Sequence, residues 1–273
     1  MADPTHPLPS GFPAPLLARA LDDALAADAE VPVLAISGLQ GSGKSTLAAQ
    51  LQALAGARGL ACTVLSIDDF YLPRAQRRAL ARRVHPLLAT RGPPGTHQVQ
   101  LALEVIDALR AGRAVQVPRF DKLGDERLPR AQWQRVAAGT RLVVFEGWFL
   151  GTPAQAPVEL ALPLNALERD EDPHGSWRRF CNDALARDYP PLWARADRLW
   201  FLQPPGFEVV LRWRGQQERT LQATQPRRAG MSPAQLARFV QHYERVSRQA
   251  LRTLPALADV VVPLDARRRP GAV

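Results

Sequence analysis

The chain has 273 residues, 46% of them hydrophobic, and a formal net charge of +9, so it can bury a full core as a soluble α/β protein. No apolar run is long enough to cross a membrane, and the first residues lack the basic start and apolar stretch of a signal peptide. The two cysteines, Cys62 and Cys181, show no metal-ligand spacing and indicate a reducing compartment, so we expect a cytoplasmic protein.

The first predicted elements surround a glycine-rich loop. Residues 1–14 are rich in proline and predict an irregular arm, and residues 16–27 predict a short helix. Residues 31–37 form an apolar run typical of a buried strand, and residues 46–56 carry apolar side chains at helical spacing. Between strand and helix, residues 38–45 read Gly-Leu-Gln-Gly-Ser-Gly-Lys-Ser, which is the phosphate-loop pattern G-x-x-x-x-G-K-[ST].

This phosphate loop is the most specific functional signal in the chain, because both of its flanks are also correct. Its glycines let backbone N–H groups surround a phosphate chain, and the helix that follows adds aligned peptide dipoles. Lys44 is predicted to reach the β- and γ-phosphates and the Ser45 hydroxyl to bind Mg²⁺. A chance glycine turn is the disfavoured alternative. The expected nucleotide-binding residues are Gly38, Gly41, Ser42, Gly43, Lys44, Ser45 and Thr46.

A second buried strand is predicted over residues 61–67, and it ends in Asp68 and Asp69. The arginine-rich residues 74–83 predict a helix without the interleaved aromatics of a single-strand nucleic-acid surface. A solvated helix face is favoured there, ahead of a basic funnel for an anionic substrate and of a nucleic-acid groove. A loop over residues 90–97 and a helix over residues 99–109 follow.

The second half of the chain continues the alternation of strands and helices. Ser232, followed by proline and by Gln235, predicts the start of a long helix. The alternation favours a mainly parallel sheet with helices on both faces. The remaining predicted elements are a strand over 114–118, a strand over 141–145, a loop over 151–165, a largely helical stretch over 171–196 with a break near 190–191, a strand over 198–202, a helix over 207–219, a helix over 232–254, a strand over 259–263 and a frayed tail from 267.

Charged residues follow several of the predicted strands. Because ligands of open parallel sheets bind beyond the carboxyl ends of the strands, these residues are candidates for a phosphoryl-transfer site. Glu146 follows a buried strand, as expected of an acid that acts on Mg²⁺ or its waters, and a solvated carboxylate is the alternative. For Asp68 and Asp69 the alternative is a turn or a helix N-cap. For His97 a packing role and a functional role are equally open.

Lysine usage singles out Lys122. Among 35 basic residues only Lys44 and Lys122 are lysines, so the chain uses arginine almost wherever a positive charge is sufficient. A compact ammonium and a planar guanidinium are not interchangeable, which makes Lys122 a site candidate. The alternative is a surface lysine retained by chance.

Several motifs occur together in a fixed order. They are residues 38–46, Ser66-Ile-Asp-Asp-Phe-Tyr-Leu72, Arg91-Gly-Pro-Pro-Gly-Thr-His97, Pro118-Arg-Phe-Asp-Lys122, Val144-Phe-Glu-Gly-Trp148, Asn165-Ala-Leu-Glu168 and Phe207-Glu-Val-Val-Leu-Arg-Trp-Arg214. In this combination, from about residue 31 to 264, the chain resembles the plant- and fungal-type D-glycerate 3-kinases and their bacterial relatives. That family lies within the uridine kinase, phosphoribulokinase and pantothenate kinase group.

The resemblance implies a P-loop kinase core with a five-stranded, mainly parallel sheet, a lid and acceptor-binding insertions. It implies ATP and Mg²⁺ as cofactors and glycerate as the acceptor, with Asp68 as general base. The domain limits that we expect are an arm over 1–14, one kinase domain over 15–266 and a basic tail over 267–273. The acceptor-side residues that it implies are Asp69, Tyr71, Arg91, Thr96, His97, Arg119, Asp121 and Lys122, and the lid residues are Arg212 and Arg214.

One position departs from the family pattern, and other functions stay open. The loop motif usually continues with Asp after His97, whereas this chain has Gln98. The alternatives are the same chemistry on a nucleoside, pantothenate or a sugar, and a P-loop protein that binds ATP to regulate a partner. We expect a small hydroxy-acid substrate and no nucleic acid or membrane partner, and the sequence leaves the oligomeric state open.

Overall fold

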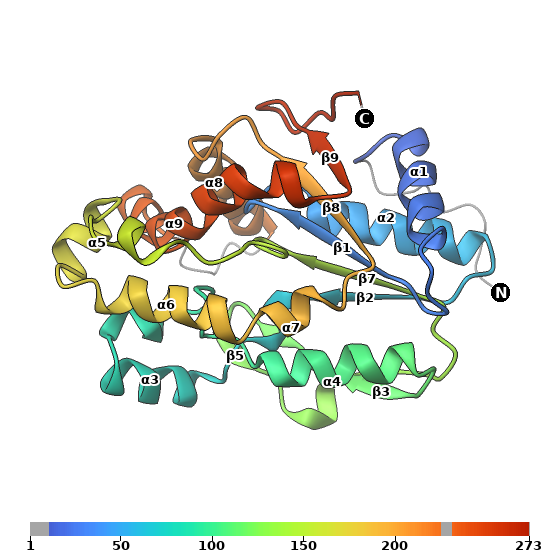
Figure 1. The fold of residues 1–273 in the computed structure, drawn as a ribbon, viewed down its shortest axis with the longest axis horizontal. Coiled ribbons are helices and arrows are strands. Elements are labelled where there is room, and N and C mark those ends of the chain that lie inside the picture. Colours follow the sequence, from blue (N-terminus) through green and yellow to red (C-terminus); the bar gives the residue numbers. More distant parts are fainter. Residues whose placement is uncertain (1–10, 225–230, 273) are drawn as a thin grey trace.

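A computed structural model describes residues 11–224 and 231–272 and shows a layered α/β architecture (Figure 1). Its central sheet has five parallel strands in the order β2-β7-β1-β8-β9. The predicted parallel sheet is therefore confirmed. The strands are β1 (Val33–Gly38), β2 (Cys62–Ser66), β7 (Leu142–Gly147), β8 (Arg198–Gln203) and β9 (Val260–Pro263).

Helices cover both faces of the sheet, because alternate side chains of each strand point to opposite faces. Leu34 and Ile36 pack with α1 (Ala14–Leu25) and α2 (Lys44–Ala57). Val33 and Ala35 belong to the core on the opposite face. That face is covered by α4 (Val99–Arg110), α6 (Ser176–Arg187) and α7 (Pro190–Trp193) (Figure 1).

The strand predicted over residues 114–118 is real but lies outside the central sheet. β3 (Val115–Val117) pairs in antiparallel fashion with β6 (Gln134–Val136). A second ribbon, β4 (Phe120–Asp121) and β5 (Glu126–Arg127), follows it. The sequence pattern fits this position. Val115-Gln-Val117 alternates apolar and polar side chains. A central parallel strand is buried on both faces, as all six residues of β7 are. Residues 119–122 therefore reach the site on an insertion and not on a sheet strand.

The helices of the C-terminal half differ in detail from the prediction. The stretch over 171–196 is divided between α6 and α7, and a further short helix, α5 (Ala166–Glu171), ends where it begins. α8 spans Val209–Thr224, and α9 spans Pro233–Leu257. The predicted capping box is confirmed, because Ser232 Oγ accepts from the Gln235 N–H and Gln235 Oε1 accepts from the Ser232 N–H. Across residues 11–224 and 231–272, no helix is both long and apolar enough to span a membrane.

The arginine-rich helix α3 (Arg74–Arg83) only partly matches the solvated face that we predicted. Arg78, Arg82 and Arg83 are exposed. Arg77 is fully buried, and its guanidinium donates to the carbonyls of Leu72, Ala89 and Asp125 and pairs with the Asp125 carboxylate at 2.9 Å. This arginine therefore joins the helix to the turn between β4 and β5.

The segment predicted as a frayed tail makes defined contacts. Arg268 has a left-handed backbone (φ 65°), unusual for a residue with a Cβ. Its Nε donates to the Gly41 carbonyl at 2.5 Å, and its guanidinium lies 5.1 Å from the Trp213 ring centroid. Of the predicted arm over 1–14, residues 1–10 lie outside the described residues.

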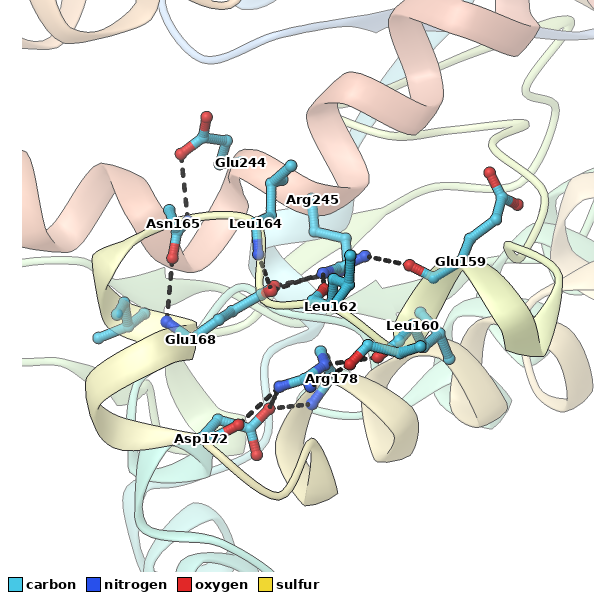
Figure 2. A network of polar contacts seen from close by, with 12 residues as sticks. Glu159, Leu160, Leu162, Leu164, Asn165, Glu168, Asp172, Arg178, Glu244 and Arg245 are labelled. Carbon is cyan, nitrogen blue, oxygen red and sulfur yellow. Dashed lines mark hydrogen bonds and ion pairs between the residues drawn. The ribbon is translucent and has the colours of Figure 1, made fainter.

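Two buried arginines hold the segment that precedes α6, as Figure 2 shows. Arg245 of α9 forms a bidentate pair with Glu168, at 2.7 and 2.5 Å, and donates to the carbonyls of Glu159 and Leu162. Arg178 pairs with Asp172 at 3.0 Å and donates to the carbonyl of Leu160. These contacts satisfy backbone oxygens of a segment that has no sheet partners.

We predict that acid destabilises this fold through two buried histidines. Burial lowers the pKa of His97 to about 3 and that of His242 to about 4. The unfolded chain binds a proton near the ordinary histidine pKa of about 6.5, whereas the folded chain does not. The free energy of unfolding should therefore fall as the pH drops from about 6.5 towards 4, by up to about 1.4 kcal/mol per pH unit for each histidine.

Urea unfolding at several pH values between 7.5 and 4.5 measures this slope. His242→Gln should give a shallower slope than the wild type, because glutamine does not titrate there. His174→Gln is the matched control, since His174 is exposed. Equal slopes for the wild type and His242→Gln would contradict the assignment.

Candidate active site

The phosphate loop joins β1 to α2 in the conformation that an anion site needs. Gly41 and Gly43 have φ angles of 83° and 97°, in the left-handed region that favours glycine. A Cβ on Gly41 would lie 2.7 Å from the Trp213 Cβ, so the loop also needs glycine for close packing. α2 begins at Lys44, which places the positive end of its dipole at the loop.

Three polar side chains meet beside this loop. Lys44 Nζ donates to the Leu39 carbonyl at 3.1 Å, across the loop itself. Ser45 Oγ donates to Glu146 Oε1 at 3.0 Å, so β7 brings its terminal acid to the start of α2. The pKa of Lys44 lies below its ordinary value, because the effect of burial is larger than the opposing effect of the charges of Glu146 and Asp68.

The Ser45–Glu146 pair fits a hard divalent cation. Both groups supply oxygen donors, which Mg²⁺ prefers. Among the residues that the structure describes, no group of three or more His, Cys, Asp and Glu side chains could hold a metal. That is compatible with Mg²⁺, which is usually bound by one or two carboxylates, water and substrate phosphates.

Asp68 lies at the end of β2 in a 3₁₀ turn (Ile67–Phe70) and faces the same pocket as Lys44. Tyr71 Oη donates to Asp68 Oδ1 at 2.5 Å, and Lys122 Nζ donates to Oδ2 at 2.6 Å. Burial raises the pKa of Asp68, but the Lys122 charge and the hydrogen bonds from Lys122 and Tyr71 have the larger, opposite effect. Together they lower this pKa to about 2. Asp68 is therefore a carboxylate at neutral pH.

Asp69 points elsewhere and binds the ribbon insertion. Its Oδ2 accepts from Arg119 Nη1 at 2.6 Å, and its Oδ1 accepts from the Phe120 N–H at 3.0 Å. Arg119 also donates to Gln134. Asp69 and Arg119 thus attach the ribbon to β2, and neither side chain lines the pocket. Asp121 stays within its own turn, where it accepts from the Leu123 N–H at 2.9 Å.

Arg91 lines the pocket, but its guanidinium is already engaged. Nη1 donates to Asp125 Oδ1 at 2.5 Å, and Nη2 donates to the Lys122 carbonyl at 3.0 Å. Asp125 is at the tip of the β4–β5 turn, where it also pairs with Arg77. Arg91 therefore fixes the backbone that carries Lys122.

Thr96 and His97 lie behind the pocket wall. Thr96 is fully buried; its Oγ1 donates to the Pro93 carbonyl at 2.7 Å and accepts from the Gly92 N–H at 3.0 Å. The His97 ring lies 4.8 Å from the Tyr71 ring, centroid to centroid, and its Nδ1 is 2.7 Å from Tyr189 Oη. The structure places both residues as supports of the loop and of Tyr71.

The two arginines of the expected lid separate. Arg214 of α8 lines the pocket, with its guanidinium 5.7 Å from the Phe239 ring centroid. Arg212 points away and donates to the Ala266 carbonyl at 2.6 Å. Gln98, where the family pattern has Asp, accepts a hydrogen bond from Arg127 Nη1 at 2.5 Å. Its side chain therefore contacts β5 and does not line the pocket.

The pocket has a volume of about 140 Å³ and gathers four cationic and two acidic side chains. Trp148, and Phe239 and Tyr243 of α9, complete its wall. No motif in the sequence pointed to the two residues of α9, because their positions fit the apolar face of any amphipathic helix. The lining residues are Gln40, Gly41, Lys44, Ser45, Asp68, Tyr71, Arg91, Lys122, Glu146, Trp148, Arg214, Gln217, Phe239 and Tyr243.

Comparisons with known proteins show what this chain is similar to. Residues 33–155 match the model of the Phosphoribulokinase / Uridine kinase family. A Schizosaccharomyces pombe protein, "Uncharacterized kinase mug58", is 36% identical over 221 residues, which cover 77% of this chain and 78% of that protein. The chloroplastic D-glycerate 3-kinase of Arabidopsis thaliana is 31% identical over 266 residues, covering 88% of this chain and 54% of that protein, so the chain spans about half of its length.

The fold agrees as well. The solved structure of D-glycerate 3-kinase from Cryptococcus neoformans var. grubii superposes with a TM-score of 0.77 at 23% identity, covering 94% of this chain and 96% of that chain. The architecture is thus that of a P-loop kinase, and the resemblance found in the sequence is confirmed. The chain belongs to the phosphoribulokinase/uridine kinase family, as a relative of the D-glycerate 3-kinases and a kinase that transfers a phosphoryl group to an alcohol.

Proposed function

We propose that this protein transfers the γ-phosphoryl group of ATP to a hydroxyl group of D-glycerate, with Mg²⁺ as the metal. The observation that carries the proposal is the position of Asp68, a carboxylate in the same pocket as Lys44 and bonded to Lys122 at 2.6 Å. A base beside the phosphate loop and a cation beside the base suit an acceptor that has both a hydroxyl and a carboxylate. The similarity to the Arabidopsis enzyme supports glycerate as that acceptor.

On the nucleotide side, the loop and α2 bind the phosphates, and Lys44 exchanges its bond to the Leu39 carbonyl for the β- and γ-phosphates. Ser45 and Glu146 are the residues that would hold Mg²⁺. The ion, when bound, neutralises charge that develops on the phosphate oxygens. Arg214, on α8, faces the same pocket and supplies a further cation.

On the acceptor side, Asp68 orients the hydroxyl and takes its proton. The hydroxyl oxygen then forms a bond to the γ-phosphorus, and the bond from that phosphorus to the β–γ bridging oxygen breaks, which leaves ADP. Lys122 binds the carboxylate of the acceptor. Arg91 holds the Lys122 backbone, and Asp69 with Arg119 holds the ribbon.

The test is ADP release by the pure protein with ATP, Mg²⁺ and single acceptors. D-glycerate should stimulate release well above the basal rate. Lys122→Arg should raise the KM for glycerate far more than the KM for ATP, because the longer planar group misplaces the charge. Unchanged acceptor kinetics in this variant would remove Lys122 from the site. Stimulation by uridine, pantothenate or a sugar, and not by glycerate, would favour the same chemistry on another acceptor.

A further inference from the structure

Both carboxylate oxygens of Asp68 are already hydrogen-bonded in this structure, and the inference from this rests on the proposed function. Tyr71 Oη occupies Oδ1 at 2.5 Å, and Lys122 Nζ occupies Oδ2 at 2.6 Å. Each oxygen keeps a second acceptor site, so a hydroxyl can still approach, but an ammonium bonded to the carboxylate makes it a weaker base. Proton transfer to Asp68 therefore becomes easier when one donor leaves, and the surroundings of the two donors show which one can.

Tyr71 is fixed. Its side chain is 4% exposed, and its ring contacts the rings of His97 and Phe120 at centroid distances of 4.8 and 5.1 Å. The Lys122 side chain, in contrast, is 59% exposed and ends a flexible chain of four methylenes. Its backbone stays in place, because Arg91 donates to the Lys122 carbonyl. The ammonium can therefore move while its attachment does not.

The other cations in or near the pocket are less available to an acceptor. The guanidinium of Arg91 is bonded to Asp125 at 2.5 Å, and that of Arg119 to Asp69 at 2.6 Å. Lys44 bonds across the phosphate loop, where the nucleotide will be. Arg214 of α8 donates to Gln217 Oε1 at 2.7 Å, and its guanidinium lies 5.7 Å from the Phe239 ring centroid. An acceptor carboxylate that enters the pocket therefore meets Lys122 as its most mobile counter-ion, and Asp68 competes with it for the same ammonium.

We propose that the Lys122–Asp68 ion pair keeps the kinase inactive until an acceptor carboxylate takes over the Lys122 ammonium and frees Asp68 Oδ2. The freed oxygen accepts the proton of the acceptor hydroxyl as the new O–P bond forms and ADP departs. The acceptor thus activates its own base. An acceptor without a carboxylate leaves the pair closed, and so does water, which limits wasteful hydrolysis of ATP.

Electrostatics supports this exchange. Burial alone raises the pKa of Asp68, and the Lys122 charge is the largest factor that lowers it. Moving the ammonium to a substrate carboxylate therefore makes Asp68 a stronger base. The other titratable groups that act on Asp68 are Lys44 at the phosphate loop and the buried Tyr71, His97 and Tyr243.

The test divides glycerate into its two functional parts. Propionate keeps the carboxylate on three carbons but has no hydroxyl, and glycerol keeps the hydroxyls but has no carboxylate. With wild-type protein, ATP and Mg²⁺, propionate should raise ATP hydrolysis by about 10²-fold, the lower end of the range of general-base catalysis, because water takes the place of the hydroxyl. Glycerol, and sodium chloride at the same ionic strength, should not.

Lys122→Met should hydrolyse ATP about 10²-fold faster than the wild type without any additive, and propionate should not stimulate it further. The acid limb of its pH–rate profile should move to higher pH, because the pKa of Asp68 rises when the ammonium is removed. Arg141→Met is the matched control: Arg141 is 56% exposed and pairs with Glu30 at 3.7 Å, before β7 begins. It should behave as the wild type.

The outcomes separate this inference from the proposed function. If glycerate is phosphorylated but propionate has no effect and Lys122→Met hydrolyses ATP at the wild-type rate, the exchange is overturned and the function stands. If propionate stimulates hydrolysis through Lys122 but glycerate is not phosphorylated, the exchange is supported and glycerate is the wrong acceptor.

Discussion

Turnover of the Asp68→Asn variant is expected to fall by about 10²–10⁴-fold, the usual contribution of a general base. Asparagine keeps the shape of the side chain, and its amide oxygen can still accept a hydrogen bond from Tyr71 or Lys122. It cannot take a proton from the acceptor hydroxyl. Affinity for ATP should change little, because the phosphate loop and the Ser45–Glu146 pair are untouched. Steady-state kcat and KM for both substrates, with equilibrium binding of ATP, measure these effects.

Asp69→Asn is the matched control for this prediction. Its carboxylate bonds to Arg119 and to the Phe120 N–H, so the substitution should loosen the ribbon that carries Lys122 and raise the acceptor KM. An inactive Asp69→Asn beside an active Asp68→Asn would exchange the two roles. If both variants keep near-normal turnover, a phosphoryl-transfer site at the end of β2 is contradicted.

Arg245→Met is expected to lower the free energy of unfolding by about 3–5 kcal/mol, the usual cost of leaving a buried charge without its partner. Glu168 is fully buried, and both of its carboxylate oxygens accept from Arg245. The variant also removes donors from the carbonyls of Glu159 and Leu162 (Figure 2). Methionine keeps much of the side-chain volume, so the lost polar contacts dominate. Urea or thermal unfolding measures the change.

A second arginine on the same helix is the control. Arg238 pairs with Glu171 at 2.5 Å, but these side chains are 51% and 40% exposed. Water screens such a pair, so Arg238→Met should cost no more than about 1 kcal/mol. Equal losses from the two variants would mean that burial does not set the strength of the Arg245–Glu168 pair.

Local patterns allowed most of the fold to be predicted. The apolar runs of β1 and β7, the glycine loop and the capping box at Ser232 each depend on a few neighbouring residues, and all are present as expected. The strand over 114–118 shows the limit of this reasoning. Its sequence specifies an extended conformation, whereas its partner, β6, is chosen by tertiary contacts that no local pattern records.

The candidate site was predictable only in part, for the same reason. Of the acceptor-side residues expected from the resemblance, Tyr71, Arg91 and Lys122 line the pocket, whereas the side chains of Thr96, Asp121 and Arg119 hold loops and ribbons. A motif does not distinguish a residue that contacts a substrate from one that supports it. The bias against lysine did single out a residue of the pocket, because it concerns chemistry and not spacing.

The contact between Arg268 and the Gly41 carbonyl has a consequence for biosynthesis. The two residues are 227 positions apart, so a ribosome makes the phosphate loop long before the residue that holds its carbonyl. Such distant contacts form late in folding, after the cost of closing a long segment has been met. A growing chain therefore contains the complete nucleotide-binding motif well before it can hold that motif in its final shape.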